Sequence, residues 1–193
     1  MRDAITNSAR PGAVPAVRLE AEQHDGVAVV NLRVDSTAPG VLAALRRVLG
    51  LDLPVVPCTC VANDRIRIVW AGPDDWFVVG APGTQAQIAA DLRAALSGTH
   101  CAVTDVSSGY CVVKLSGSSA RDVLAQGCPL DLHPRAFAPG QAAGSHFFKA
   151  SIHLWQVDPA PSFELLVRRS FAAYFWQVLR DCTIECGLTA RTF

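Results

Sequence analysis

The sequence predicts an α+β fold built from a duplicated unit of strand, helix, strand, strand and helix, with helices on one face of antiparallel sheets. Short β-branched stretches alternate with stretches of helical periodicity, and this order of elements occurs twice. Matching residues also recur at fixed offsets between the two halves. Helices that lie on one face of a sheet bury the apolar side of both, so each unit can form a core.

The first repeat opens with a strand over 27–34, because VAVVNLRV is short and rich in β-branched residues. A helix follows over 41–49, where apolar residues recur at helical spacing, and Gly50 ends it. Alternating arginine and isoleucine in RIRIVW predict a half-buried strand at 65–70, which the turn AGPDD joins to a strand at 76–80. These two strands form a hairpin.

A helix closes the first repeat and two strands open the second. The helix begins at a capping box of Thr84 and Gln87, and its apolar stripe ends at Gly98. The strands are AVTDV at 102–106 and YCVVKL at 110–115, both rich in β-branched residues. The second half therefore also begins with β-structure ahead of its first helix.

The rest of the second repeat follows the same order. A helix is opened by Ser119 and stopped by Gly127. A long hairpin comes next, with arms at 146–157 and 163–168 around the turn DPAPS. An amphipathic helix that starts after Ser170 closes the repeat.

The two repeats align when residue numbers of matching positions are compared. The difference between these numbers grows along the chain, because the loop APGQAAGS lengthens the second repeat. A chance likeness between amphipathic helices stays open as the alternative. We expect a flexible N-terminal arm at 1–16, one domain at 17–184 with pseudo-repeats 17–100 and 101–184, and a C-terminal tail at 185–193. The matched pairs are Leu45 with Leu124 and Leu51 with Leu130, at an offset of 79, and Trp76 with Phe163 and Leu92 with Leu179, at an offset of 87.

Charge in this chain is sparse and balanced. Seventeen basic and 17 acidic side chains cancel without forming a charged run, which argues against nucleic acid as a partner. Half of the residues are hydrophobic and only 18% are charged, compared with about 25% in an average soluble domain. Because the centres of protein interfaces are depleted in charge, this composition indicates that a partner covers part of the surface.

The chain is expected to be soluble and cytoplasmic. Its first residues lack the apolar core of a secretory signal, and its longest apolar run is too short to span a bilayer. The seven cysteines are then expected to be reduced thiols. Cys58 with Cys60, and Cys182 with Cys186, could each donate two metal ligands, but nothing completes a four-ligand zinc site, so we expect no metal.

No catalytic constellation is visible in the sequence. There is no glycine-rich phosphate loop, and VSSGY lacks the spacing of a nucleophile elbow. His146 and His153 would point to opposite faces of one continuous strand, and His133 reads as a helix-exit residue. Three carboxylates keep a second interpretation open: Asp74 and Asp75 as turn formers or a binding pair, and Asp105 as a hydrogen-bonded strand residue or a ligand group.

The aromatic residues suggest a core and a candidate interface. Trp70, Trp76 and Phe163 lie in predicted strands and are expected to fill the core. Trp155, Phe171 and Trp176 lie among other aromatic residues in the second half and are the candidate partner-interface residues, with core packing as the alternative. We assign no catalytic, cofactor-binding or metal-binding residue.

Three stretches resemble the gamma subunit of the heterotetrameric sarcosine oxidases: GPDDWFVVG, DVSSGYCVVKLSGSSARDVLAQGCPLDLHPRAF and APSFELLVRRSFAAYFWQVL. The resemblance runs from about residue 16 to 179, and GCPLDLHPRAF and FELLVRRSFA are its most specific parts. It implies a fold similar to the folate-binding domain of aminomethyltransferases. This is a duplicated α+β unit, in agreement with the repeat.

The resemblance also implies a function. Such a chain is a non-catalytic subunit that assembles with and stabilises the alpha subunit, together with beta and delta, and holds no cofactor. FAD, FMN, NAD, tetrahydrofolate and zinc are expected in the partner subunits. The complex oxidatively demethylates sarcosine to glycine, with formation of hydrogen peroxide and methylene-tetrahydrofolate.

Two alternatives to this function stay open. One is a free-standing, tetrahydrofolate-binding protein of the aminomethyltransferase type. The other is the small subunit of a related multi-subunit amine dehydrogenase, because such subunits resemble one another.

Overall fold

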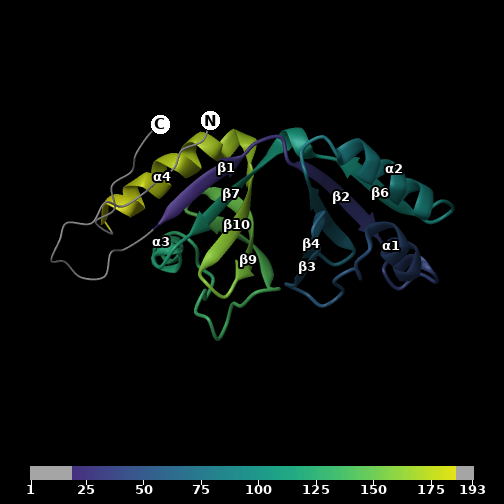
Figure 1. Cartoon of the computed structure of the whole chain (residues 1–193), viewed down its shortest axis with the longest axis horizontal. Coiled ribbons are helices and arrows are strands. Elements are labelled where there is room, and N and C mark those ends of the chain that lie inside the picture. The colour runs from purple at the N-terminus through teal and green to yellow at the C-terminus, as the bar shows by residue number, and fades with distance from the viewer. Residues whose placement is uncertain (1–18, 186–193) are drawn as a thin grey trace. The chain divides into compact units, whose positions relative to one another are not determined.

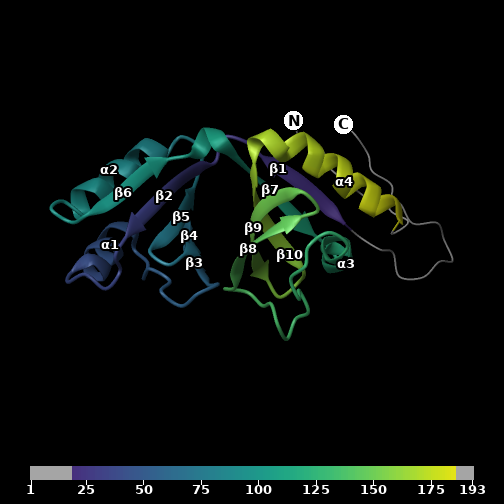
Figure 2. The ribbon, with the colours of Figure 1, turned by 180° about the vertical axis from the view of Figure 1, so that it is seen from behind.

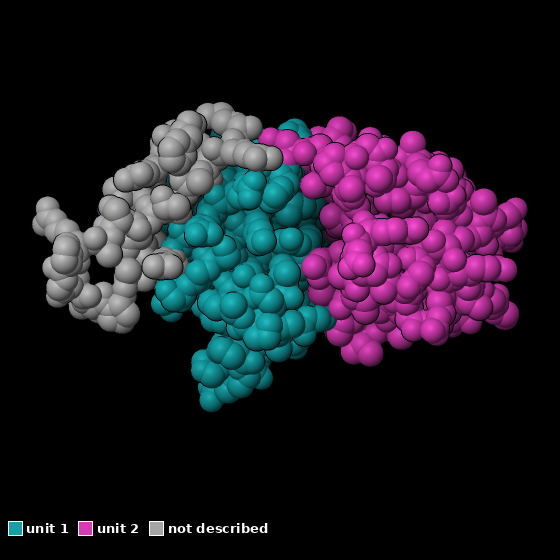
Figure 3. Space-filling model, in the orientation of Figure 1, with its two compact units in different colours: residues 1–24, 111–193 teal, residues 25–110 magenta. Residues whose placement is uncertain are grey.

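The structure, a computed structural model, describes residues 19–185. The expected N-terminal arm at 1–16 lies outside the described residues, as does the expected tail at 185–193 apart from Glu185. The chain divides into two compact units, coloured separately in Figure 3. Unit 2 is the contiguous segment 25–110, and unit 1 combines 1–24 with 111–193.

Unit 2 is a five-stranded antiparallel sheet in the order β3-β4-β5-β2-β6, with two helices on one face (Figure 1). Apolar side chains alternate along β2 and line the helix stripes, so both surfaces meet in one core. The elements are β2 (Ala28–Val34), α1 (Val41–Leu49), β3 (Cys60–Ala62), β4 (Ile66–Gly72), β5 (Asp75–Gly80), α2 (Gln85–Ala95) and β6 (Cys101–Asp105), followed by a 3-10 turn, η1 (Ser107–Gly109).

Unit 1 contains the same architecture, with the strand order β1-β7-β10-β9-β8. Figure 2 shows β8 beside β9, at the edge of this sheet. The helices α3 and α4 pack on the face that carries the buried side chains of β7, β9 and β10. The elements are β1 (Glu20–His24), β7 (Tyr110–Ser116), α3 (Ala120–Ala125), β8 (Ala142–Phe147), β9 (Ala150–Asp158), β10 (Ser162–Arg168), η2 (Arg169–Phe171) and α4 (Ala172–Glu185).

The two sheets match strand for strand, but the chain supplies their outer strands differently. Strands β2, β5, β4 and β3 correspond in order to β7, β10, β9 and β8. In unit 2 the fifth strand is β6, which follows α2, whereas in unit 1 this place is taken by β1, from before β2. The unit boundaries therefore differ from the pseudo-repeats 17–100 and 101–184, because each repeat gives its first strand to the other unit's sheet.

Residues aligned by counting occupy equivalent places in the two cores. Leu45 and Leu124 are fully buried on α1 and α3, and Trp76 and Phe163 are both the second residue of their strands, β5 and β10. Leu92 and Leu179 are fully buried on α2 and α4, while Leu51 and Leu130 are both half-buried. A chance likeness between helices would not place all of these pairs in matching elements.

The structure confirms the α+β class but adds three strands to the predicted units. The added strands are β1, β3 and β8, all poor in the β-branched and aromatic residues that identify strands. The predicted strand at 146–157 was wrong: the chain turns at Phe148, which adopts a positive φ of 50°, and the two sides pair as β8 and β9. This turn lacks the glycine or asparagine that usually identifies a hairpin.

The helix ends were predicted with mixed success. Gly50 ends α1 in the left-handed region, with φ of 69° and its N–H donated to the carbonyl of Arg46, as expected. The capping box at Thr84 was wrong, because the Thr84 hydroxyl donates to the carbonyl of Ala81 and Gln87 donates to Asp91 instead. Between residues 19 and 185, no helix is long and apolar enough to cross a membrane.

The edge strand β1 should be essential for unit 1. Ala21 is 2% exposed, lies opposite Leu115 on β7 and belongs to the core cluster. We expect Ala21→Asp to lower the free energy of unfolding by about 2–4 kcal/mol, because it buries a carboxylate without a partner. Urea denaturation measures the loss. The control Glu20→Gln, at the exposed neighbouring position, should change the free energy of unfolding by less than about 0.5 kcal/mol. An equal effect of both variants would contradict the role of β1 in the core of unit 1.

Candidate functional site

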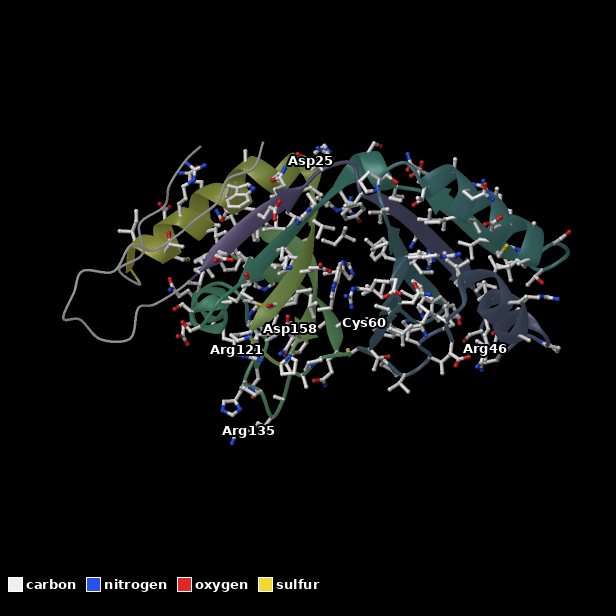
Figure 4. The ribbon with its side chains drawn as sticks, viewed as in Figure 1. Asp25, Arg46, Cys60, Arg121, Arg135 and Asp158 are labelled. Atoms are coloured by element: carbon white, nitrogen blue, oxygen red, sulfur yellow. The ribbon has the colours of Figure 1, made fainter. Side chains whose placement is uncertain are left out.

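The segment between α3 and β8 carries the most distinctive motif, GCPLDLHPRAF, and is held down at three points. Cys128, Leu132 and Phe137 are buried, while the residues between Leu132 and Phe137 are exposed. The carbonyl of His133 accepts the N–H groups of Ala136 and Phe137, which closes a tight turn. Figure 4 labels Arg135 at the tip of this segment.

Arg121, on α3, is the residue that connects this segment to the sheet. Its guanidinium donates to the carbonyl of Leu132 and, at 3.0 Å, to the Oε1 atom of Gln156 on β9. The same group lies 5.1 Å from the ring centroid of Phe163, a cation–π arrangement. Burial lowers the pKa of Arg121. A half-buried cation with these partners joins α3, the segment, β9 and β10.

Gln156 continues this polar cluster toward the end of β9. It is 1% exposed, and its Nε2 atom donates to the carbonyl of Asp158 at 2.7 Å. The Oδ1 atom of Asp158 is buried and has no hydrogen-bond partner among residues 19–185. Figure 4 labels Arg121 on α3 and Asp158 at the end of β9. The polar cluster of Arg121, Gln156 and Asp158 therefore explains how the GCPLDLHPRAF segment is held in place. Its contacts do not indicate a catalytic step.

The three predicted interface residues lie in different surroundings. Trp176 is 6% exposed, belongs to the core of unit 1 and donates its indole N–H to Gln23. Trp155 is fully buried and donates its indole N–H to Glu164 at 2.7 Å. Phe171 alone has an exposed ring, at 38%. Phe171 is therefore the most accessible of the three in this chain, and the contact of all three residues with a partner stays a prediction.

The three carboxylates that kept a ligand site open do not line one cleft. Asp75 accepts a hydrogen bond from Asn31 at 2.6 Å, and Asp105 accepts two from Ser107, from its N–H at 2.9 Å and its hydroxyl at 2.5 Å. Asp74 has a φ of 55° at the β4–β5 turn, and its carbonyl accepts the N–H of Val34. Only Asp74 lines the cleft described next.

That cleft lies in unit 2 and has a volume of about 600 Å³. The residues that line it include the ionisable Arg33, Asp35, Asp74 and His100. Asp35 is already engaged, because the amide and hydroxyl of Thr37 both donate to it. The hydroxyl bond, then the amide bond, lower the pKa of Asp35. Charged residues therefore line part of the cleft, but its lining contains no nucleophile and base in hydrogen-bond contact that would indicate catalysis.

Within residues 19–185, the cysteines and histidines do not assemble into a metal site. Cys58 lies in a left-handed turn with φ of 61° and is exposed, whereas Cys60 is buried on β3, so the two thiols do not share one face of a strand. Cys182 is buried on α4, and its expected companion Cys186 lies outside the described residues. In the described part of the chain, no group of three or more histidine, cysteine, aspartate or glutamate residues could hold a metal ion.

The histidines also separate. His146 lies on β8 and His153 on β9, so the premise of one continuous strand was wrong. His133 is exposed at the turn of the motif segment, and its Nδ1 atom accepts the N–H of Arg135. Sequence reasoning missed Arg121 and Phe148. The only signals were an arginine in the first turn of a helix with a buried face and two successive phenylalanines before a lysine.

Comparisons with known proteins give one consistent answer. A family model described as "Sarcosine oxidase, gamma subunit family" matches residues 33–185. The chain is 34% identical over 147 residues to sarcosine oxidase subunit gamma of Corynebacterium sp. (strain P-1), covering 76% of this chain and 71% of that one. It is 36% identical over 144 residues to sarcosine oxidase subunit gamma of Arthrobacter sp, covering 74% and 70%.

Two solved structures resemble the fold. A chain of the heterotetrameric sarcosine oxidase from Corynebacterium sp. U-96, in complex with pyrrole 2-carboxylate, matches with a TM-score of 0.81 and 25% identity, covering 89% of this chain and 87% of that chain. The glycine cleavage system aminomethyltransferase T from Bartonella henselae matches with a TM-score of 0.60 and 15% identity, covering 82% and 44%. At this lower identity, the second likeness concerns the fold alone.

The Arg121 contacts should hold the motif segment in place. We expect Arg121→Met to lower the free energy of unfolding by about 2 kcal/mol, because the carbonyl of Leu132 and the amide of Gln156 lose a charged donor. Trypsin should also cleave faster after Arg135. Urea denaturation and timed proteolysis measure the two effects. The Arg121→Lys variant should have a stability and a cleavage rate between those of wild type and Arg121→Met. An Arg121→Met variant as stable and as resistant to trypsin as wild type would contradict this role of Arg121.

Asp105 should make stability depend on acidity. The Ser107 hydroxyl, followed by its amide, holds the pKa of Asp105 below its ordinary value of 3.8. The carboxylate therefore contributes stability above that value, and this contribution is lost as the pH falls through the lower, folded-state pKa. The stability difference between wild type and Asp105→Asn should shrink from about pH 5 to about pH 3, measured by urea denaturation. A constant difference would argue against this linkage.

Proposed function

Because the chain belongs to the sarcosine oxidase gamma subunit family, we propose that it is the gamma subunit of a heterotetrameric sarcosine oxidase, with no catalytic role of its own. One observation carries the proposal. Nearly the whole chain, 89%, matches 87% of a chain in a heterotetrameric sarcosine oxidase, with a TM-score of 0.81. A likeness that extends over both chains supports the same place in the same kind of assembly.

Within such a complex, we assign this chain to assembly and stabilisation of the alpha subunit, with beta and delta as further partners. Sarcosine would be oxidatively demethylated to glycine by the partners, with hydrogen peroxide and methylene-tetrahydrofolate as products. FAD, FMN, NAD, tetrahydrofolate and zinc would be held by those subunits. The polar contacts of Arg121, Gln156 and Ser107 support this division, because each connects elements of the fold.

The aminomethyltransferase-like fold raises a second function, tetrahydrofolate binding by the free chain. Fold alone does not carry that function, because one fold hosts many activities. The carboxylates that could hold a pterin, Asp74, Asp75 and Asp105, bind separate partners or line different surfaces. We therefore favour the subunit role, and a related amine dehydrogenase complex differs from it only in the partners' substrate.

The proposed location is the cytoplasm. The cysteines of the described residues, from Cys58 to Cys182, are all free thiols, which is the state expected in a reducing compartment.

The test is assembly. The chain, carrying an affinity tag, is produced with the alpha, beta and delta subunits of its host and purified. We expect all four subunits to co-purify with a flavin absorption spectrum and sarcosine-dependent peroxide formation, while the isolated chain is colourless and inactive. Failure of the wild-type chain to bring down the other subunits would overturn the proposal.

A calorimetric titration tests the second function, tetrahydrofolate binding by the free chain, independently of the subunit role. Tetrahydrofolate added to the isolated chain should produce no saturable heat. Saturable binding that Asp74→Ala abolishes would instead support the free-standing folate protein, because Asp74 is the carboxylate in the cleft of unit 2.

A further inference from the structure

The duplicated fold provides an internal comparison between two equivalent corners. In each unit, a glycine lies just after the first helix, and the turn of the edge hairpin packs beside this glycine. In unit 2 these parts are Gly50 and the turn at 63–65, and in unit 1 they are Gly127 and the turn at Phe148 and Lys149. The same structural task is therefore solved twice in one chain.

Unit 2 solves it with polar groups. Asn63 accepts the N–H groups of Arg65 and Ile66 on its Oδ1 atom, both at 2.9 Å. Its Nδ2 atom donates to the carbonyl of Leu49 at the end of α1, at 3.4 Å. An exposed asparagine thus closes the turn and caps the helix, as is usual for a surface that faces water.

Unit 1 solves the same task with an aromatic residue. The backbone N–H of Phe148 donates to the carbonyl of Gly127 at 2.9 Å, and the ring is 42% exposed. The ring lies so close to Gly127 that a Cβ atom there would come within 2.5 Å of it. Phe147 supports it edge-on, with ring centroids 5.1 Å apart.

The backbone at Phe148 is unfavourable for this residue. Its φ of 50° lies in the left-handed region, which bulky side chains avoid and which asparagine or glycine adopts more easily. The hydrogen bond that ties this turn to Gly127 is donated by the main chain of Phe148, so asparagine or glycine at this position could make the same bond. Strain that the fold does not require is concentrated at functional sites.

Neighbouring aromatic residues extend the surface onto α4. The N–H of Lys149 donates to the hydroxyl of Tyr174 at 3.4 Å, and Tyr174 packs edge-on against Phe171 with ring centroids 6.3 Å apart. Phe171 is 38% exposed. The equivalent helix start in unit 2 is formed by Thr84 and Gln85, which are polar. We call Phe148, Phe171 and Tyr174 the aromatic corner.

Basic side chains flank the aromatic corner along the chain. Lys149 follows Phe148, and Arg168 and Arg169 precede Phe171, and all three are exposed. A protein surface that binds this corner needs an apolar pocket for the rings and carboxylates around it for the cations. Exposed aromatic and arginine residues are also the types that dominate binding energy at protein interfaces.

We propose that the aromatic corner docks into an apolar pocket, bordered by carboxylates, on a partner subunit of the complex. The inference rests on the proposed function, because it assumes that the chain has larger partner subunits. It adds the surface of this chain that makes the contact and the chemistry of the surface that receives it. Phe148 inserts, Phe171 and Tyr174 widen the contact, and the basic side chains pair with carboxylates at its edge.

The experiment uses the tagged full chain produced with the alpha, beta and delta subunits. Phe148→Asn keeps a residue that tolerates the left-handed backbone and removes the ring, and Lys149→Glu reverses one charge. The apparent Kd is obtained from the fraction of this chain that stays in the complex on dilution, measured by size-exclusion chromatography. We expect each variant to weaken association by about tenfold or more, while the melting temperature of the isolated Phe148→Asn chain equals or exceeds that of wild type.

The matched control is Arg65→Glu, the same kind of charge reversal at the equivalent corner of unit 2, which should assemble like wild type. If wild type assembles and the Phe148 and Lys149 variants assemble equally well, the docking proposal is wrong and the proposed function stands. An equal loss in the Arg65 variant would also overturn it, because the effect would not belong to this corner. If the isolated chain forms dimers that Phe148→Asn abolishes and the complex is unaffected, the occupant is a second copy and the proposal is wrong.

Discussion

Both units depend on one constraint: each contains a short helix whose apolar side must be covered by one face of a sheet. The helices α1 and α3 have only nine and six residues, too few to be stable alone, so their apolar stripes require a broad apolar surface. Five strands provide that surface in each unit. One edge strand of each sheet comes from the other repeat: β6 in unit 2 and β1 in unit 1. Exchange of these strands lets each sheet reach its width.

The sequence was informative where burial follows a simple period. Gly50 after a helical stripe and the alternation of arginine and isoleucine in RIRIVW predicted their elements, and the offsets between repeats placed Leu45 and Leu124 in matching positions. The sequence was uninformative for strands that form through hydrogen-bonded pairing without a β-type residue pattern of their own. Strand β1 reads as polar and forms by pairing with β7, far away in the chain, and the hairpin of β8 and β9 turns at Phe148, so pairing between strands had to override local preference.

The candidate site was harder to predict because its important groups depend on tertiary contacts. Arg121 is an ordinary charged residue until Leu132, Gln156 and Phe163 are brought around it. A contact of Trp176 with a partner stays a prediction, and the sequence could not show that Gln23, far away in the chain, accepts the indole N–H of Trp176. The chemistry of such residues is set by neighbours that only the folded chain supplies.

The order of the strands also has a consequence for synthesis on the ribosome, where the N-terminus emerges first. Unit 2 is contiguous and can close once residue 110 has emerged, whereas β1 is made first and its partner strand β7 only later. Until then β1 is an unpaired strand next to a folded unit, and such an edge invites pairing with another chain. Its polar sequence, EAEQH, offers few apolar side chains to a wrong partner during this delay.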